Sequence, residues 1–426
     1  MRDYFLVLGI LAALGMALIY PFAGVILWAW FAIQNPHEEA YGFSQGLQLN
    51  LIIAVVTLIA WLLSRDRKLP PGHFLIWTMV LLLIWMTFNS FFAYLPDWSW
   101  PFWSRTWKIF ALGLLVATVA TNRVRIHAMI WTIVISLFYY GVKGGIFTLV
   151  TGGNYHVLGP ERSIIADNNQ LALALLMSVP LANYLRQQSA NRYVRWALTT
   201  GMAFTLISVV GSYSRGALIA LAALGAFWWL RSRQKILYAA LAGIFAIGAV
   251  TFMPDAFWDR AGTIQTAQQD ASFHGRVVAW QVAKDYADDH FPLGAGFYAP
   301  QLPGIFHHYF PDEEPHAAHS IYFQVLGEHG YPGLLLYLLM IIGAFWTTST
   351  IIRRSRKIDE MAWAGNLALM IQNSLIAFCV GGAALSMAYY DVFLICVALL
   401  VPMNELVAAQ SRPATPVLSR PSPIRS

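Results

Sequence analysis

The sequence predicts an all-α protein that crosses a membrane many times. Hydrophobic residues make up 58% of the 426 positions and charged residues only 11%, against roughly 25% charged residues in soluble domains. The apolar residues form repeated runs of about 20 residues, the length that a helix needs to cross a bilayer. These runs lack the alternation of barrel strands, and an open sheet leaves its backbone unsatisfied in lipid. A bundle of membrane-spanning helices is therefore the expected fold.

The first apolar run, Tyr4–Ile33, is interrupted by Pro21, which removes a helix hydrogen bond. We interpret it as one broken span, with two short spans as the alternative. The later predicted spans are Leu47–Leu63, His73–Ala93, Ser104–Thr121, Ile126–Val150, Ala166–Leu185, Trp196–Val210, Arg215–Leu230, Ile236–Phe252, Tyr331–Ile351, Met361–Gly381 and Val392–Asn404. By length, the chain is expected to cross the membrane about twelve times.

Basic residues fall in alternate short connections, such as those that contain Arg65, Arg123 and Arg353, and also at Arg2 and in the tail. Connections rich in Lys and Arg stay on the cytoplasmic side. If every span crosses once, all of these segments share one face. The sequence therefore predicts a cytoplasmic location for both termini.

One long polar interval, residues 253–330, separates two groups of apolar runs and contains seven of the eleven histidines. The alternation of faces places it on the extracytoplasmic side. We therefore expect an N-terminal transmembrane bundle at 1–252, a loop subdomain at 253–330 and C-terminal transmembrane helices at 331–404. The segment 405–426 is rich in Pro and Ser towards its end and is expected to be a disordered cytoplasmic tail.

Several basic residues remain on the outer side, where membrane insertion disfavours them. Arg105, Lys108, Lys143 and Arg215 lie at or just inside helix ends, where a charge costs less than at the bilayer centre. Snorkelling to the lipid headgroups accounts for any one of them. Several cations on one membrane face indicate an anion-binding site.

A small and polar break, Gly211–Gly216, places Arg215 at the start of an apolar span. Free N–H groups at a helix start and a planar guanidinium both bind anions. The alternative is a turn whose arginine meets lipid headgroups. Two further stretches fit the anion site: Gly159–Gln170, which contains Arg162, Asp167 and Asn168, and Ser272–Trp280, which contains Arg276.

The end of the long loop, Pro315–Gly330, becomes helical in pattern from His319, so that His319 lies at the membrane boundary. Histidine titrates near neutrality and is the most common general base. A purely structural histidine is the alternative. Glu328 either orients His319 or, because it lies one helical turn or more away, is structural.

A metal site and a serine hydrolase are weaker alternatives. The cluster of possible metal ligands comprises His307, His308, Asp312, Glu313, Glu314, His316 and His319. Its spacing matches neither the zinc-protease pattern nor a calcium loop. The hydrolase motif Gly-x-Ser-x-Gly is absent from the sequence, as is a nucleotide-binding loop. We expect neither a metal nor another cofactor, and no nucleic-acid partner.

Four motifs together resemble the O-antigen ligase/polymerase superfamily. They are Ser-Arg-Gly at Ser214–Gly216, Gly-Arg-x3-Trp at Gly275–Trp280, Pro-Leu-Gly-x-Gly at Pro292–Gly296, and Ala-His-Ser-x-Tyr followed by Gly-Glu-His-Gly within Ala318–Gly330. Gly-Val-Lys-Gly-Gly at Gly141–Gly145 and the Asp-Asn-Asn stretch at Asp167 most resemble exosortase-associated O-glycosylation ligases. The resemblance extends over nearly the whole chain.

The resemblance implies a glycosyltransferase of the glycosyltransferase C-like membrane fold, in the bacterial inner membrane with its active site facing the periplasm. Its implied donor is a glycan on undecaprenyl diphosphate. A ligase passes the glycan to lipid A–core, a polymerase passes it to another lipid-linked chain, and a related enzyme modifies proteins. Membrane lipids are the only other expected partners, and family members are thought to use no metal.

The family's loop histidine corresponds to His319 and its essential arginine to Arg215, while Arg276 matches an arginine near the donor phosphates. Arg162 and Lys143 are included on the topology argument and a looser match. Supporting residues are expected among Arg105, Asp167, Asn168, Tyr322 and Glu328.

The expected reaction is attack of an acceptor hydroxyl on the anomeric carbon while the diphosphate leaves, with inversion. Without a metal, arginines must stabilise the departing charge, and His319 takes the hydroxyl proton. A lateral opening between helices should admit both lipids. A transporter is the alternative from another class, but it should place its polar residues near the membrane midplane.

Overall fold

The computed structural model describes residues 2–64, 68–231, 234–254 and 271–411. These residues form helices and loops without a β-strand. Before the long loop the helices are α1 Arg2–Ile19, α2 Pro21–Gln34, η1 Phe43–Gly46, α3 Leu49–Leu63, α4 Phe74–Phe91, α5 Pro96–Val119, α6 Arg123–Val150, α7 Asn168–Gln188, α8 Arg192–Gly211, α9 Arg215–Arg231 and α10 Lys235–Phe252. The loop and the C-terminal part contain α12 Ala271–Asp289, η3 Ala299–Gln301, α13 Pro303–Tyr309, α14 Ile321–Ser355, η4 Asp359–Met361, α15 Ala362–Gly382 and α16 Asp391–Gln410. Arg65, Arg67, Arg233, Arg260 and the tail from residue 412 lie outside the described residues.

Among the described residues, seven helices are long and apolar enough to cross a membrane. The chain is therefore a multi-pass α-helical protein, although the length criterion supports fewer than the expected twelve crossings. Several helices that run beside these seven are too short: α2 has 14 residues, α3 has 15 and α9 has 17. A span of about 30 Å requires roughly 20 helical residues.

The N-terminal apolar run forms two antiparallel helices rather than one broken span. The chain turns between α1 and α2 at Tyr20, and Pro21 occupies the first turn of α2, where its missing N–H costs nothing. The backbone N–H of Ser44, beyond the end of α2, donates to the Asp3 carboxylate at the start of α1, with an N···O distance of 3.0 Å. The start of α1 and the end of α2 therefore lie at one face of the bundle.

This hairpin corrects the expected position of the N-terminus. Phe22, at the start of α2, packs against the Arg125 guanidinium at the start of α6. Lys143, near the other end of α6, pairs with Glu39 beyond the end of α2. Arg2 is therefore at the face of Lys143 and not at the face of Arg125, because the break at Pro21 adds one more passage through the bundle than a single span would.

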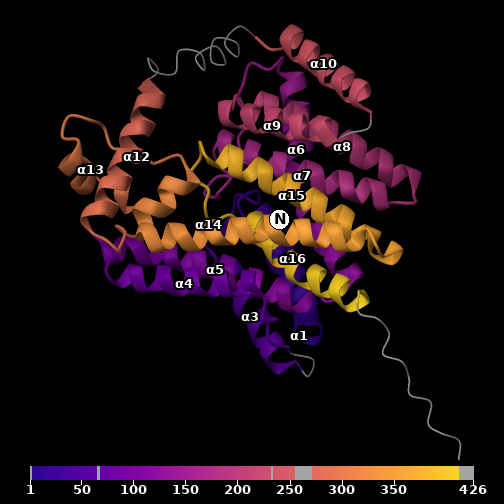
Figure 1. Cartoon of the computed structure of the whole chain (residues 1–426), viewed down its shortest axis with the longest axis horizontal. Helices are drawn as coiled ribbons and strands as arrows, with labels where there is room; N and C mark the ends of the chain where they lie inside the picture. The colour runs from indigo at the N-terminus through magenta and orange to yellow at the C-terminus, as the bar shows by residue number, and fades with distance from the viewer. Residues whose placement is uncertain (1, 65–67, 232–233, 255–270, 412–426) are drawn as a thin grey trace, which may run out of the picture.

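We call the face at which α7, α9 and α14 begin the site face. The centre of the bundle is formed by α7, α15 and α16, whose side chains are mostly buried from end to end. Around this centre, the long helices run roughly parallel, and α12 and α13 lie together at one end of the bundle (Figure 1). The described part of the predicted loop subdomain therefore covers the bundle at the site face.

A bend in α14 joins this subdomain to the bundle. Gly330 interrupts the helix with a φ of 66°, a conformation that favours glycine. A Cβ there would also lie 2.3 Å from the Pro292 carbonyl oxygen. The Glu328 carbonyl just before this bend accepts hydrogen bonds from the Asn89 side chain of α4 and from the Gly296 N–H. The Gly-Glu-His-Gly motif thus connects α4, α14 and the segment before η3.

Candidate functional site

The polar break before α9 is a tightly bonded turn. The Ser214 hydroxyl accepts from the Ala217 N–H and so caps the helix that begins at Arg215. The Ser212 hydroxyl accepts from the Ser214 N–H, and the Tyr213 hydroxyl donates to the Gly153 carbonyl. Arg215 is half-buried at the first position of α9, where the positive end of the helix dipole adds to its own charge.

The start of α7 is bonded to this same turn. Asp167 caps α7 by accepting from the Asn169 N–H at 2.8 Å. The buried Asn168 side chain donates to the Ser212 carbonyl at 2.6 Å. The Asp-Asn-Asn stretch therefore lies against the Arg215 turn, although the two segments are 44 residues apart in the sequence.

The end of α15 brings Arg215 and the end of the long loop together. A Cβ on Gly216 would lie 3.5 Å from Ala384 and 3.8 Å from the Gly381 carbonyl oxygen. From the other side, the Tyr322 hydroxyl donates to the Cys379 carbonyl at 3.1 Å. The helix that begins at Arg215 and the helix that begins just after His319 therefore both contact the last turn of α15.

α12 holds the segment before His319 in place. The Trp280 indole N–H donates to the Ala318 carbonyl at 2.6 Å, and the Trp280 ring stacks on Phe323, with ring centroids 5.0 Å apart. One turn earlier, a Cβ on Gly275 would lie 2.7 Å from the His316 ring. Both ends of the Gly-Arg-x3-Trp motif therefore have a structural role: Gly275 leaves room for the His316 ring, and Trp280 binds the Ala318 carbonyl. Arg276 lies between these two residues in the sequence.

His319 is half-buried and has a φ of 42°, in the left-handed region that costs a non-glycine residue energy. Its pKa is lowered below the usual 6.5 by burial and by the positive charge of Arg276, while Asp167 acts in the opposite direction. His319 is therefore a neutral imidazole near pH 7. The same interactions show that Arg276, Asp167 and His319 lie within electrostatic range of one another.

The described histidines and acids of the loop do not gather around a metal-sized point. Among the described residues, no three His, Cys, Asp or Glu side chains converge as metal ligands. His274 pairs with Glu313 at 2.9 Å, and the His316 ring packs at Gly275. The ligand cluster suggested by the sequence is distributed between α13, which contains His307 and His308, and the loop that follows it.

Comparison with known families assigns two parts of the chain. Residues 200–338 match a family model described as O-Antigen ligase. This match supports the O-antigen ligase superfamily for the chain. Residues 1–190 match a family of unknown function (DUF5935). The comparison with curated proteins found no match.

The O-antigen ligase match contains all four motifs from which the superfamily was expected, including Arg215, Arg276 and His319. Superfamily membership supports an enzyme of the ligase or polymerase kind. Asp167, Asn168, Arg162, Lys143 and Arg105 lie in the region matched by the other family. Only contacts in the folded chain connect the first two of these residues with the Arg215 turn.

Glu328 is buried in a structural network. Its carboxylate accepts hydrogen bonds from the Tyr389 hydroxyl at 2.7 Å, the Tyr298 N–H at 3.1 Å and the Gln324 amide at 3.3 Å. Gln324 in turn accepts from the Ala388 N–H. These bonds explain how a carboxyl group is accommodated without exposure, and they give Glu328 a role in joining three segments rather than in orienting His319.

Two other predicted residues interact with groups that are not part of the Arg215 turn. Lys143 pairs with Glu39 at 3.2 Å on the outer side of α6. Arg105, on α5, acts electrostatically on Asp391 and Tyr298, beside the Glu328 network. Arg162 is exposed, with a φ of 56°, in the loop that leads to Asp167.

Sequence reasoning missed the partners of Glu328, which are Tyr298, Gln324 and Tyr389. Gln324 had a usable signal, since a residue four positions before a carboxylate lies on the same helix face. Tyr298 and Tyr389 gave none, because their contacts depend on how distant segments pack.

Proposed function

We propose that this superfamily member is an O-antigen ligase-type glycosyltransferase. It moves a glycan from undecaprenyl diphosphate to a hydroxyl of lipid A–core or a related acceptor, at the periplasmic face of the inner membrane. The observation that supports this proposal most directly is the arrangement around the end of α15. There, a neutral histidine lies within electrostatic range of Arg276, and the helix of Arg215 begins beside the helix that follows His319.

In the proposed reaction, the acceptor oxygen forms a bond to the anomeric carbon of the donor sugar. The bond between that carbon and the diphosphate oxygen breaks, and its electron pair leaves with the diphosphate. His319 takes the proton of the acceptor hydroxyl. A single displacement inverts the anomeric configuration.

Arg215 and Arg276 balance the charge that develops on the leaving group. Preorganised donors in a site with little water are worth about 2.7–4 kcal/mol each in the transition state. The negative charge of the donor also affects the pKa of His319. Arg276 lowers the pKa of His319, and an anionic donor beside Arg276 counters that effect. Donor binding therefore makes His319 a stronger base when it is needed, and the chemistry requires no metal.

A lipid-linked polysaccharide polymerase and a protein O-glycosylation ligase use the same chemistry with another acceptor. The residues around His319 do not distinguish these acceptors. A polysaccharide transporter is a less favoured alternative, because the candidate site residues lie at one end of the bundle, whereas a transporter binds its substrate near the midplane. His319 and the turn at Arg215 both lie at helix starts on the site face.

The direct test uses purified protein in detergent, where no gradient exists. We expect transfer of glycan from the undecaprenyl diphosphate donor to lipid A–core, with undiminished rate in a metal chelator. Transfer only to a second lipid-linked chain identifies a polymerase. Failure to transfer to any of the three acceptor classes, with gradient-dependent movement of the glycan in vesicles, contradicts the proposal. If a chelator abolishes the activity and a divalent ion restores it, the result supports the metal alternative.

A further inference from the structure

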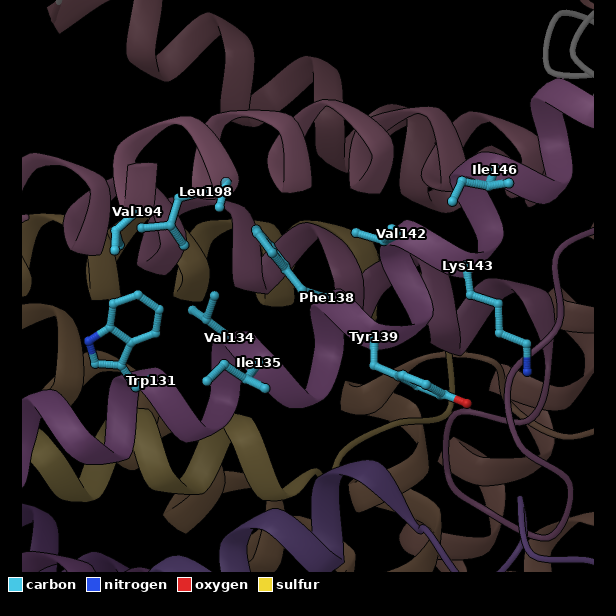
Figure 2. A pocket seen from close by; sticks show the side chains of 11 residues that line it. Trp131, Val134, Ile135, Phe138, Tyr139, Val142, Lys143, Ile146, Val194 and Leu198 are labelled. Atoms are coloured by element: carbon cyan, nitrogen blue, oxygen red, sulfur yellow. The ribbon is translucent and has the colours of Figure 1, made fainter. Parts of the chain in front are cut away.

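Two hollows lie side by side along α6, and Lys143 lines both of them. The first is a groove of about 860 Å³ between α6 and α8 on the lateral surface of the bundle. Its other lining residues are apolar or aromatic, including Trp131, Phe138 and Leu198 (Figure 2). Lys143 is the charged residue in this lining, at one end of the row of side chains in Figure 2.

The second hollow is a cavity of about 420 Å³ between α6, the segment after α2 and the loop before α7. Its lining is rich in groups that accept hydrogen bonds or can both donate and accept them: Glu38, Glu39, Glu161, Tyr41, Tyr140 and His156. A ligand pocket of this size with a few converging polar groups is the usual form of a small-molecule site.

The glycines of the Gly-Val-Lys-Gly-Gly motif set this geometry. A Cβ on Gly141 would lie 2.3 Å from the Thr205 hydroxyl oxygen, and one on Gly144 would lie 2.3 Å from the Ser208 hydroxyl oxygen. Small residues at this spacing let two membrane helices approach closely. The close approach of α6 and α8 fixes Lys143 between the two hollows.

The charges of the polar cavity favour a neutral, hydroxyl-rich ligand over an anion. Three carboxylates line it, and the one lysine already pairs with Glu39 at 3.2 Å. A phosphate at this place would meet like charges at short range. Sugar hydroxyls are suited to it, because an ionised carboxylate only accepts hydrogen bonds and a hydroxyl donates them.

The polar cavity adjoins the site around His319. Ala166 lines the cavity, and the next residue, Asp167, acts electrostatically on His319. His156 lines it as well and packs on Tyr213 of the Arg215 turn, with ring centroids 4.5 Å apart. The loop before α7 is fixed to that turn by the hydrogen bond from the Val157 N–H to the Gly211 carbonyl. A ligand in the cavity therefore lies beside the proposed reaction centre.

We propose that a glycolipid binds along α6, with its hydrocarbon chain in the α6/α8 groove and part of its saccharide in the polar cavity. Lys143 marks the junction between the apolar and the polar part. The inference rests on the proposed function, since a glycosyltransferase of this kind has two glycolipids as substrates. It assigns Lys143 and its partner Glu39 to glycolipid placement and not to the leaving diphosphate.

The test uses two variants that alter one hollow each, in nanodiscs. Glu39→Gln with Glu161→Gln removes carboxylates from the cavity, and Ala197→Trp fills the groove from an exposed position of its lining. The matched controls are Glu360→Gln and Thr200→Trp, at exposed positions outside both linings. Transfer is measured against the concentration of an undecaprenyl diphosphate-linked trisaccharide and, separately, of lipid A–core. Binding of each probe and of phosphatidylglycerol is measured by native mass spectrometry.

We expect both hollow variants to raise the KM of the same substrate. For the carboxylate variant the rise should be at least about tenfold, the loss that corresponds to one charge-assisted hydrogen bond. The substrate whose KM rises identifies whether donor or acceptor lies there. The carboxylate variant should weaken binding of that glycolipid but not of phosphatidylglycerol. Unchanged KM values and unchanged binding of both glycolipids would overturn the inference. If the wild-type protein binds but transfers nothing, the proposed function fails, and the binding measurements still decide the inference.

Discussion

At the scale of single residues, the proposed mechanism depends on a histidine within electrostatic range of a guanidinium. The lowered pKa of His319, caused by burial and by Arg276, keeps the imidazole able to accept a proton at neutral pH. Sequence reasoning could select His319 and Arg276 from their motifs. It could not show that a residue in α12 acts electrostatically on a residue before α14, because that proximity depends on how the loop folds back.

His319→Gln should lower the transfer rate by about 10²–10⁴-fold, the usual contribution of a positioned general base. The folded structure should persist, since His319 lies in a half-buried loop. His308→Gln, at an exposed position of α13, is the matched control. Single-turnover transfer measures the effect. A normal rate in His319→Gln would remove the base assignment.

Arg276→Gln should move the acidic limb of the pH profile of kcat/KM. Transfer requires neutral His319, so the rate falls as the pH drops through its pKa. Arg276 lowers that pKa below 6.5, and its removal raises the pKa, so the limb should shift to higher pH. Lys284→Gln changes a cation of the same helix that pairs instead with Asp288 and should leave the limb in place. An identical limb in all three proteins argues against an electrostatic effect of Arg276 on His319.

Arg215→Lys should lower the transfer rate by roughly 10²–10³-fold, the effect of losing one preorganised donor. Lysine keeps the charge but lacks the planar fork that binds two phosphate oxygens. Because Arg215 is at a helix start whose cap is Ser214, the helix should form as before. Circular dichroism checks the fold, and a near-normal transfer rate would count against a direct role.

At the scale of elements, helix positions followed from apolar runs, but their connections did not. The apolar period locates α14 without showing that Gly330 bends it, since that bend depends on Pro292 in another segment. The break at Pro21 is visible in the sequence. That the chain reverses there into a hairpin follows only from the contact between Asp3 and Ser44 in the folded chain. The Glu328 network joins helix, loop and subdomain in a way that no local pattern predicts.

Glu328→Gln should destabilise the protein while leaving the chemistry of folded molecules intact. Gln offers one acceptor oxygen where the carboxylate serves three donors, and a buried donor left without a partner costs about 1–3 kcal/mol. Thermal unfolding in detergent should therefore begin at lower temperature, with little change in rate per folded molecule. Glu360→Gln, at an exposed position, is the control. Unchanged stability together with lost activity would instead indicate a direct catalytic role.

At the scale of the whole molecule, the composition was sufficient to predict a multi-pass helical protein, and the motifs were sufficient to predict its superfamily. The sequence did not suffice to predict the number of passages through the bundle, because short helices such as α2 fall below the length that identifies a span. Basic residues alone misplaced the N-terminus, since one additional passage reverses the face on which Arg2 lies.

The N-terminus and the α12 subdomain should therefore be accessible from the same side of the membrane. A membrane-impermeant maleimide should label Arg2→Cys and Asp312→Cys from outside intact cells, and Arg356→Cys only after permeabilisation. All three positions are exposed, whereas the native Cys396 is buried and Cys379 is only half-exposed. Labelling of Arg2→Cys together with Arg356→Cys would contradict the hairpin of α1 and α2.

The most direct test of the proposed mechanism is a cryo-EM structure with the lipid-linked donor bound. We expect the diphosphate within hydrogen-bonding distance, about 2.7–2.9 Å, of both Arg215 and Arg276, with the anomeric carbon on the side of His319. A diphosphate bound away from these arginines, or separated from His319 by a helix, would contradict the account.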